Sequence, residues 1–259
     1  MHTTFTTQLL QDAGIKTAQH ELILGSIAPD LSILGVIPEK DAHERSIEFL
    51  DYLSHNEPSL VPFGIGFVLH GEMPRCLDHY THTAKGYIDQ KKADVLELVR
   101  KHKIDFKGIN ENMLSHCLTE FACDALADKN IPAQLHKAFK AAHLQKIAFH
   151  MGTFFNGDKD RILKILNFFK HFNFNKLRTM HGIAHTLQDF MIYQKFANKG
   201  ILNTYKYLWI RVNPFKTHKV VKLLRDVHGV VKQDCFDFLD KTQNTIYKNV
   251  VKKSLEPYL

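Results

Sequence analysis

Histidines and carboxylates recur in this chain at spacings that suit metal ligands. In the segment 64–82, His70 ends an apolar run, and Asp78 and His82 follow it, four residues apart from each other. Residues four apart lie on one face of a helix, with Cβ atoms about 5–6 Å from each other. Imidazole nitrogens and carboxylate oxygens are usual ligands of zinc. The segment therefore predicts a metal site on a helix.

A second pair with the same spacing, His116 and Glu120, lies on an otherwise apolar segment. Such pairs on facing helices are how metal ions are held in the cores of helical bundles. Asp124 follows one turn further along, where a carboxylate can orient the ring of a ligating histidine. We predict His116 and Glu120 as ligands and Asp124 as an additional, orienting residue.

A third candidate, Asp30, follows Pro29 just past the end of a predicted helix, among apolar residues. A carboxylate is costly to bury there unless it is paired or bound to a metal ion. Asp30 is therefore also predicted as a metal ligand.

The order of these residues resembles that of the zinc-dependent phospholipase C family, which is similar to the single-strand-specific zinc nucleases. The resemblance covers roughly residues 2–127. The chain carries the family's motifs in the family's order: Pro29-Asp30, then His70 with Asp78 and His82, then His116 with Glu120.

This resemblance implies a buried site of two or three zinc ions, with other divalent metals as an alternative. Such ions clamp a phosphate ester and lower the pKa of a water that attacks phosphorus in line. Asp30 is then the expected catalytic residue, as a bridging ligand or as a general base. The implied substrate is a phosphate ester, either phospholipid or nucleotide-like.

The family also has a histidine ligand one helix before its Pro-Asp pair. His2 fits that place best, and His20 is the competitor. Because His20 lies ten residues before Asp30, about 15 Å along a straight helix, joint coordination by these two residues is harder.

The chain departs from the family's pattern in two places. Where the family has a His-x-x-x-Asp pair, His70 and Asp78 are eight residues apart. Either one extra helical turn keeps them on the same face, or Pro74 breaks the helix. Secreted members also use a mature N-terminal tryptophan as a ligand, whereas this chain starts Met-His and has its one tryptophan at Trp209.

Outside these motifs, His181, His185 and Asp189 follow one another at intervals of four. They line one face of a predicted helix. They could complete the metal site, line the substrate pocket, form a second metal site or be merely polar.

The chain has 17 histidines, so most of them need a separate interpretation. His79 is a possible additional ligand because it lies between Asp78 and His82. His43, His55 and His102 stand in charged, polar stretches, and we expect them to be exposed.

The elements that position these residues are predicted to be helices. Helical periodicity recurs along the chain, and no convincing alternating strand pattern occurs. We predict an all-α, multi-helix bundle with a buried metal site. The predicted helices span residues 4–13, 17–27, 41–55, 62–75, 77–85, 93–103, 112–127, 132–150, 158–172, 176–198, 202–211, 214–227 and 230–251.

Charge is unevenly distributed. Residues 1–130 hold 12 Lys and Arg against 19 Asp and Glu, whereas the remainder has a net charge of +14. An acidic, histidine-rich portion suits divalent cations, and a basic portion suits an anionic partner such as an anionic membrane surface. We predict a metal-binding core over 1–150 and a basic half over 151–259, packed as one domain. No specific nucleic-acid-binding motif occurs.

Several classes of protein are disfavoured. The four cysteines form no Cys-x-x-Cys pair, which disfavours a cysteine zinc site or a disulfide framework. No signal peptide or membrane-length apolar run is recognised. The expected compartment is therefore the cytoplasm, with export by another route as the alternative for a phospholipase.

Three functions remain open. The first is a zinc-dependent hydrolase of phosphate esters resembling phospholipase C. The second is a nuclease or phosphomonoesterase that uses the same site. The third is a non-catalytic, partner-binding helical protein that keeps a degenerate metal site for stability.

Overall fold

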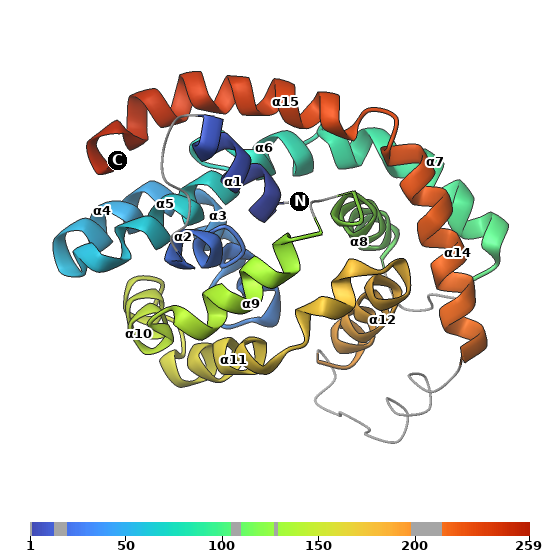
Figure 1. Cartoon of the computed structure of the whole chain (residues 1–259), viewed down its shortest axis with the longest axis horizontal. Coiled ribbons are helices and arrows are strands. Elements are labelled where there is room, and N and C mark those ends of the chain that lie inside the picture. Colours follow the sequence, from blue (N-terminus) through green and yellow to red (C-terminus); the bar gives the residue numbers. More distant parts are fainter. Residues whose placement is uncertain (1, 13–19, 105–109, 127–128, 198–213) are drawn as a thin grey trace. The chain divides into compact units, whose positions relative to one another are not determined.

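The computed structural model describes residues 2–12, 20–104, 110–126, 129–197 and 214–259 (Figure 1). Every regular element among them is a helix, so the predicted all-α class is confirmed for this part of the chain. The predicted helix at 202–211 lies outside the described residues. The helices form two compact units, each assembled from separate stretches of sequence.

The first unit comprises Met1–Thr83, Asn130–Phe174 and Asp237–Leu259. Its helices in chain order are α1 (His2–Asp12), α2 (His20–Gly25), η1 (Pro29–Leu34), α3 (Glu39–Glu44), α4 (Ser46–Asn56), η2 (Pro58–Leu60), α5 (Val61–His70), α6 (Leu77–His82), α9 (Ile131–Ala141), α10 (Leu144–Phe154), α11 (Lys159–His171), α15 (Cys235–Ile246) from Asp237 onward, η4 (Tyr247–Leu255) and η5 (Glu256–Tyr258).

The second unit comprises Ala84–Lys129 and Asn175–Phe236. Each unit thus combines segments from the acidic and the basic portions of the chain, and the predicted division at residue 150 stays a prediction. The helices of the second unit are α7 (Tyr87–His102), α8 (Glu111–Asp124), η3 (Phe174–Arg178) from Asn175 onward, α12 (Met180–Ala197) and α14 (Pro214–Val231).

Helix α5 forms the centre of the first unit. Its sequence is apolar up to its last residue, and every side chain from Phe63 to His70 is buried. Its backbone touches that of α2: a Cβ on Gly66 would lie 2.2 Å from the carbonyl oxygen of Leu22, and one on Gly25 would lie 2.0 Å from that of Phe63. Only glycine permits this approach.

Aromatic rings join α5 to two further helices. Phe67 packs against Phe49 of α4, with ring centroids 5.1 Å apart, and stacks on Phe155 at the end of α10 at 5.5 Å. All three rings are fully buried or nearly so. This apolar core fixes the end of α5, where His70 lies.

The segment predicted as one helix over 62–75 ends at His70. Gly71 has an extended backbone (φ −63°, ψ 174°), and α6 begins separately at Leu77. Proline disfavours a helix interior because its ring clashes with the preceding turn. Of the two alternatives for the segment from His70 to Asp78, the continuous helix is therefore wrong, and a break around Pro74 is confirmed.

The turn between α5 and α6 is tied to the end of α3. The backbone N–H groups of Glu72 and Met73 both donate to the carbonyl oxygen of His43, at 3.0 and 3.1 Å. The hydroxyl of Ser46 donates to the carbonyl oxygen of Met73 at 2.5 Å. These bonds hold His43 next to the turn that leads to Asp78.

Three other predicted helices are interrupted. The helix expected over 41–55 is α3 and α4, separated at Arg45. The helix expected over 132–150 is α9 and α10, separated where Ala142 has an extended backbone. The helix expected over 230–251 is the end of α14, all of α15 and the first part of η4. None of these breaks contains a proline. The hydrophobic periodicity continues across them, so it predicted one helix where the structure has more than one.

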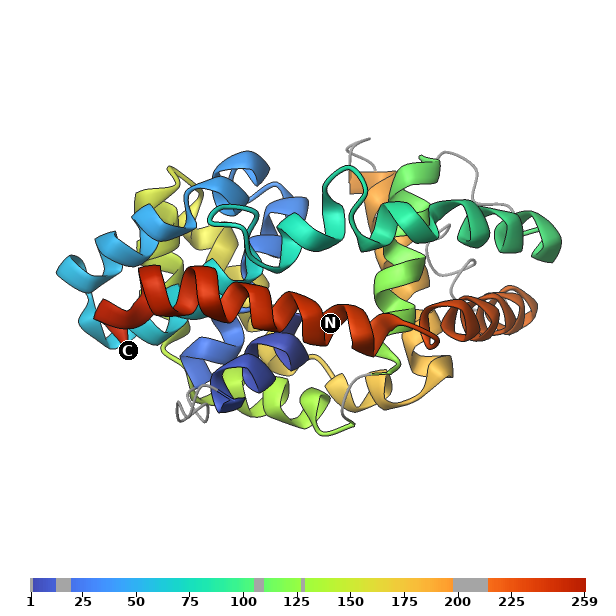
Figure 2. The same cartoon turned by 90° about the horizontal axis from the view of Figure 1, so that it is seen from above.

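The C-terminal helix covers α1 in the first unit. From Asp237 onward, α15 and η4 run alongside α1 (Figures 1 and 2). Within the described residues, no helix combines the length and apolarity that a bilayer span requires.

Gly66→Ala should destabilise the protein by about 1–3 kcal/mol, because the added methyl group cannot fit against the backbone of α2. The midpoint of urea denaturation, followed by circular dichroism, measures this. Gly229→Ala in α14 is the control: a Cβ there meets nothing within 4 Å, so the protein should be at least as stable. An unchanged midpoint for Gly66→Ala would contradict the close α2–α5 contact.

Candidate metal centre

The carboxylate of Asp78, in the first turn of α6, lies among four histidine rings of the first unit. Its side chain is 0% exposed. The ring nitrogens of His70 and His43 lie 3.0 and 3.2 Å from Oδ2, and those of His2 and His82 each lie 3.6 Å from Oδ1. Within the described residues, neither oxygen of Asp78 has a partner with hydrogen-bond geometry. A charge buried in this way requires compensation.

Two of these rings have their tautomer determined by the backbone. Nδ1 of His70 lies 2.8 Å from the carbonyl oxygen of Ser26, and Nδ1 of His43 lies 2.8 Å from that of Glu39. A carbonyl oxygen can only accept, so Nδ1 carries the proton in both rings. In the neutral rings, both Nε2 lone pairs therefore face Asp78. This is the arrangement of metal-ligating histidines, whose second nitrogen donates to a carbonyl or carboxylate.

His2 and Asp30 extend the cluster beyond Asp78. The rings of His2 and His70 are stacked, with centroids 4.0 Å apart. Oδ1 of Asp30 lies 3.4 Å from Nε2 of His70. The side chain of Asp30 is 42% exposed, in contrast to the wholly buried His70 and Asp78. The cluster therefore reaches solvent at Asp30.

The local structure explains how these residues meet. Asp30 lies in η1, directly after α2, and α2 packs on α5 through its glycine contact. Ser26 lies between α2 and η1; its hydroxyl contacts that of Thr3 at 3.2 Å, while its carbonyl oxygen accepts from His70. The start of α1, and with it His2, is thereby held beside the end of α5.

The electrostatics of the cluster favour charge on His70, His43 and Asp78. Burial lowers the pKa of His70, but the charges of Asp78 and Asp30 outweigh it and raise that pKa well above its ordinary value. Burial also lowers the pKa of His43, and Asp78 more than reverses this. Conversely, burial raises the pKa of Asp78, but His70 and His2 hold it well below its usual range. In the absence of an ion, protons on the rings neutralise the carboxylate.

Two overlapping sets of residues could hold a divalent ion. One is His43, His70 and Asp78, and the other is His2, Asp30 and His70; the ligand atoms of each set lie within 4.8 Å of one another. Each oxygen of Asp78 faces a different pair of rings. Asp78 could therefore offer one oxygen to each of two ligand sets. The nitrogen and oxygen donors of the cluster suit zinc.

Five of the residues predicted from sequence thus come together in the first unit: His2, Asp30, His70, Asp78 and His82. The other two predicted ligands, His116 and Glu120, belong to α8 of the second unit, where His116 Nε2 lies 3.1 Å from Glu120 Oε2. Their role as ligands stays a prediction. Asp124, at the end of α8, is exposed.

Of the remaining candidates, His20 and His79 belong to the first unit and the other three belong to the second unit. Of the two competing early histidines, the structure brings His2 to the cluster, whereas His20 begins α2. The ring of His79 packs edge-on against Tyr80, and burial and Arg75 lower its pKa. His181, His185 and Asp189 lie on α12 in the second unit.

His43 is the member of the cluster that the sequence did not identify. Its side chain is 12% exposed, so the expectation of an exposed residue is wrong. The same expectation is wrong for His102, which is 15% exposed and lies 2.8 Å from Asp226, and is confirmed for His55, at 74%. No sequence signal separates His43 from His55, since both stand among charged residues and contact the carbonyl oxygen four residues earlier.

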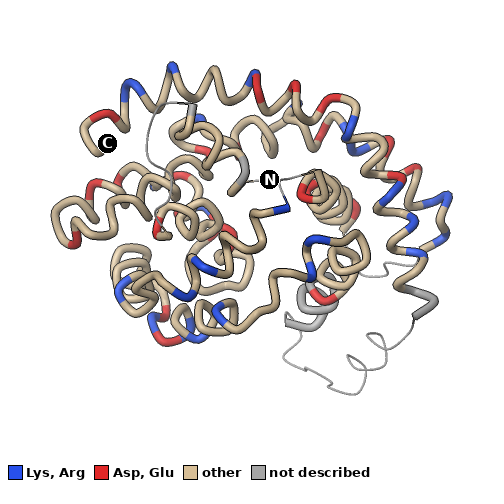
Figure 3. Tube along the Cα trace, in the orientation of Figure 1, with Lys and Arg blue, Asp and Glu red and all other residues tan. Residues whose placement is uncertain are grey.

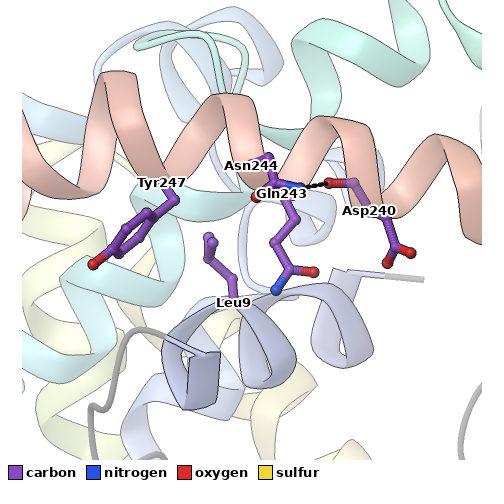
Figure 4. Close-up of a pocket in the computed structure, with 5 residues that line it drawn as sticks. All are labelled: Leu9, Asp240, Gln243, Asn244 and Tyr247. Atoms are coloured by element: carbon purple, nitrogen blue, oxygen red, sulfur yellow. Dashed lines mark hydrogen bonds between the residues drawn. The ribbon is translucent and has the colours of Figure 1, made fainter.

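The first unit also has a pocket of about 410 Å³ between α1 and the C-terminal helix (Figure 4). Leu9 faces it from α1, and the C-terminal helix contributes four mostly polar side chains. Its lining residues are Leu9, Asp240, Gln243, Asn244 and Tyr247. None of them belongs to the cluster around Asp78, so the pocket is not assigned to the metal centre.

Comparison of the chain with protein-family models, with curated proteins and with solved structures finds no match. The resemblance to zinc-dependent phospholipase C therefore rests on the motifs of this chain.

His43→Gln should weaken zinc binding by at least about tenfold, because it removes a ring nitrogen 3.2 Å from Asp78. Zinc content after dialysis against a competing chelator measures the effect. His55→Gln is the matched control, since His55 makes the same local backbone contact but is exposed. Equal zinc retention by the two variants would exclude His43 from the site.

Zinc binding at pH 7 should release about one proton or more per chain. The pKa of His70 is raised well above its ordinary value, so its ring is protonated at neutral pH and the ion must displace that proton. Affinity should accordingly fall as the pH is lowered. Titration calorimetry in buffers of different ionisation enthalpy gives the number released, and an enthalpy independent of the buffer would contradict this protonation state.

Proposed function

We propose that this protein is a zinc-dependent hydrolase of phosphate esters that acts through water bound at the cluster around Asp78. The observation that carries the proposal is the convergence of two histidines with backbone-fixed tautomers on one buried carboxylate. Maintaining such a charge without an ion requires protonated rings. A metal ion replaces those protons and uses both Nε2 lone pairs.

The chemistry follows from the residues that hold the ion. Zinc bound there would act as a Lewis acid on a phosphoryl oxygen and lower the pKa of a bound water. Asp30 lies at the border between the cluster and solvent. This position supports a role for its carboxylate in accepting a proton from the attacking water. Ser26 and Glu39 keep the rings of His70 and His43 oriented through their carbonyl oxygens.

The exposure of Asp30 favours a catalytic site over a purely structural one. Structural zinc sites are closed, with four protein ligands, whereas catalytic sites keep one position open for water or substrate. A cluster sealed on all sides would support the non-catalytic alternative. Here one carboxylate on the rim is 42% exposed.

An anionic substrate also agrees with the charge of the chain. Exposed Lys219, Lys222 and Arg225 lie on α14 of the second unit, where Figure 3 shows basic positions along the helix. Such groups attract phosphate-bearing molecules, including anionic lipid surfaces and polyanions. Phospholipid and nucleotide substrates both remain candidates on this ground.

The test combines metal analysis with hydrolysis of bis(p-nitrophenyl) phosphate, followed by phospholipid vesicles and single-stranded DNA. Asp78→Asn should lose both zinc and activity. Asp30→Asn should retain the zinc held by His43, His70 and Asp78 but lose about 10²–10⁴-fold in kcat, the usual contribution of a general base. His55→Gln should match the unaltered chain.

Each outcome has a definite meaning. Hydrolysis of vesicles alone supports a phospholipase, and hydrolysis of DNA alone supports the nuclease alternative. A chain that retains zinc but hydrolyses none of these substrates supports the non-catalytic alternative. Less than one tightly bound ion per chain, with no gain on adding zinc, would overturn the metal site itself.

A further inference from the structure

Helix α12 of the second unit carries a pair of histidines that the cluster around Asp78 does not use. His181 and His185 are one turn apart, and they are the only two histidines of the chain with a spacing of four. Their Nε2 atoms share a hydrogen bond of 3.2 Å, and their rings meet at 72°. His181 is exposed and His185 is partly exposed.

The separation of the two nitrogens matches that of two ligands on one metal ion. Zinc–nitrogen bonds of about 2.0–2.1 Å place two ligands roughly 3.3 Å apart at a tetrahedral angle and roughly 3.0 Å apart at a right angle. The observed 3.2 Å lies between these values. The two rings are far from parallel, so their lone pairs can converge on a point beside both ring edges.

The helix that carries the pair is firmly positioned. Ile183, Ala184 and Leu187 are buried on its inner face. At its start, the N–H of Gly182 donates to Thr179 Oγ1 at 3.1 Å, and a Cβ on Gly182 would lie only 1.8 Å from the carbonyl oxygen of Lys176. A fixed backbone means that little conformational freedom is lost when both rings bind one ion.

We propose that His181 and His185 form a second, surface-exposed binding site for a divalent transition-metal ion. Two imidazoles supply neighbouring ligands, and water completes the coordination. Asp189 lies one turn beyond His185 on the same face and adds negative charge close to the ion. Among divalent first-row metal ions, copper(II) should have the highest affinity for a site of imidazole nitrogens and water. The site differs from the centre at Asp78 in being open to solvent.

The experiment uses the full chain, loaded with zinc and then freed of weakly bound zinc by dialysis against a competing chelator, and titrates it with nickel(II) by calorimetry. The unaltered chain should bind one nickel ion at this site. The variants His181→Gln and His185→Gln should each bind it roughly a hundredfold more weakly, since one imidazole of a chelating pair is lost. His171→Gln is the control: His171 is an exposed histidine on α11 whose Nδ1 contacts the carbonyl oxygen of Asn167. It should bind nickel as the unaltered chain does.

A second readout locates the ion directly. Nickel(II) is paramagnetic, so it should broaden the ring-proton resonances of His181 and His185 before those of other histidines. Circular dichroism verifies that the exposed substitutions leave the helices intact. Equal nickel binding by His181→Gln and the unaltered chain, or no nickel binding by either, would overturn the proposal. The result is independent of any hydrolytic activity.

Discussion

The burial of one carboxylate, that of Asp78, is the constraint on which the candidate metal centre depends. A wholly buried anion costs several kcal/mol unless positive charge is brought to it. Four histidine rings from α1, α3, α5 and α6 provide this charge, as protons or through an ion. Elements distant in sequence must therefore meet at one point. The packing of α5 against its neighbours makes that meeting possible.

The backbone contributes as much as the side chains. The carbonyl oxygen of Ser26 determines the tautomer of His70, and Ser26 is close enough because Gly25 and Gly66 let α2 and α5 touch. The carbonyl oxygen of His43 accepts two N–H groups from the turn before α6. The glycine contact, the turn and the histidine rings are thus structurally coupled. A change in the packing of α2 on α5 would alter the orientation of His70.

Local signals made part of this centre predictable from sequence. The all-α class followed from helical periodicity, and Asp78 with His82 followed from a spacing of four in an apolar context. His43 was missed because its important neighbour, Asp78, is 35 residues away in sequence. Its own surroundings are polar and resemble those of the exposed His55. Contacts between helices determine whether such a histidine is buried, and these contacts cannot be read directly from a single sequence.

The long interval between His70 and Asp78 shows why the broken helix matters. On a continuous helix, eight residues would place the two Cα atoms about 12 Å apart along the axis. Residues on the same face would then still be too distant for their side chains to bind one ion. The observed break lets α6 return toward the end of α5, so that Nε2 of His70 and Oδ2 of Asp78 lie 3.0 Å apart. The residues between His70 and Asp78 therefore serve as a turn, and the turn makes a contact that a continuous helix would prevent.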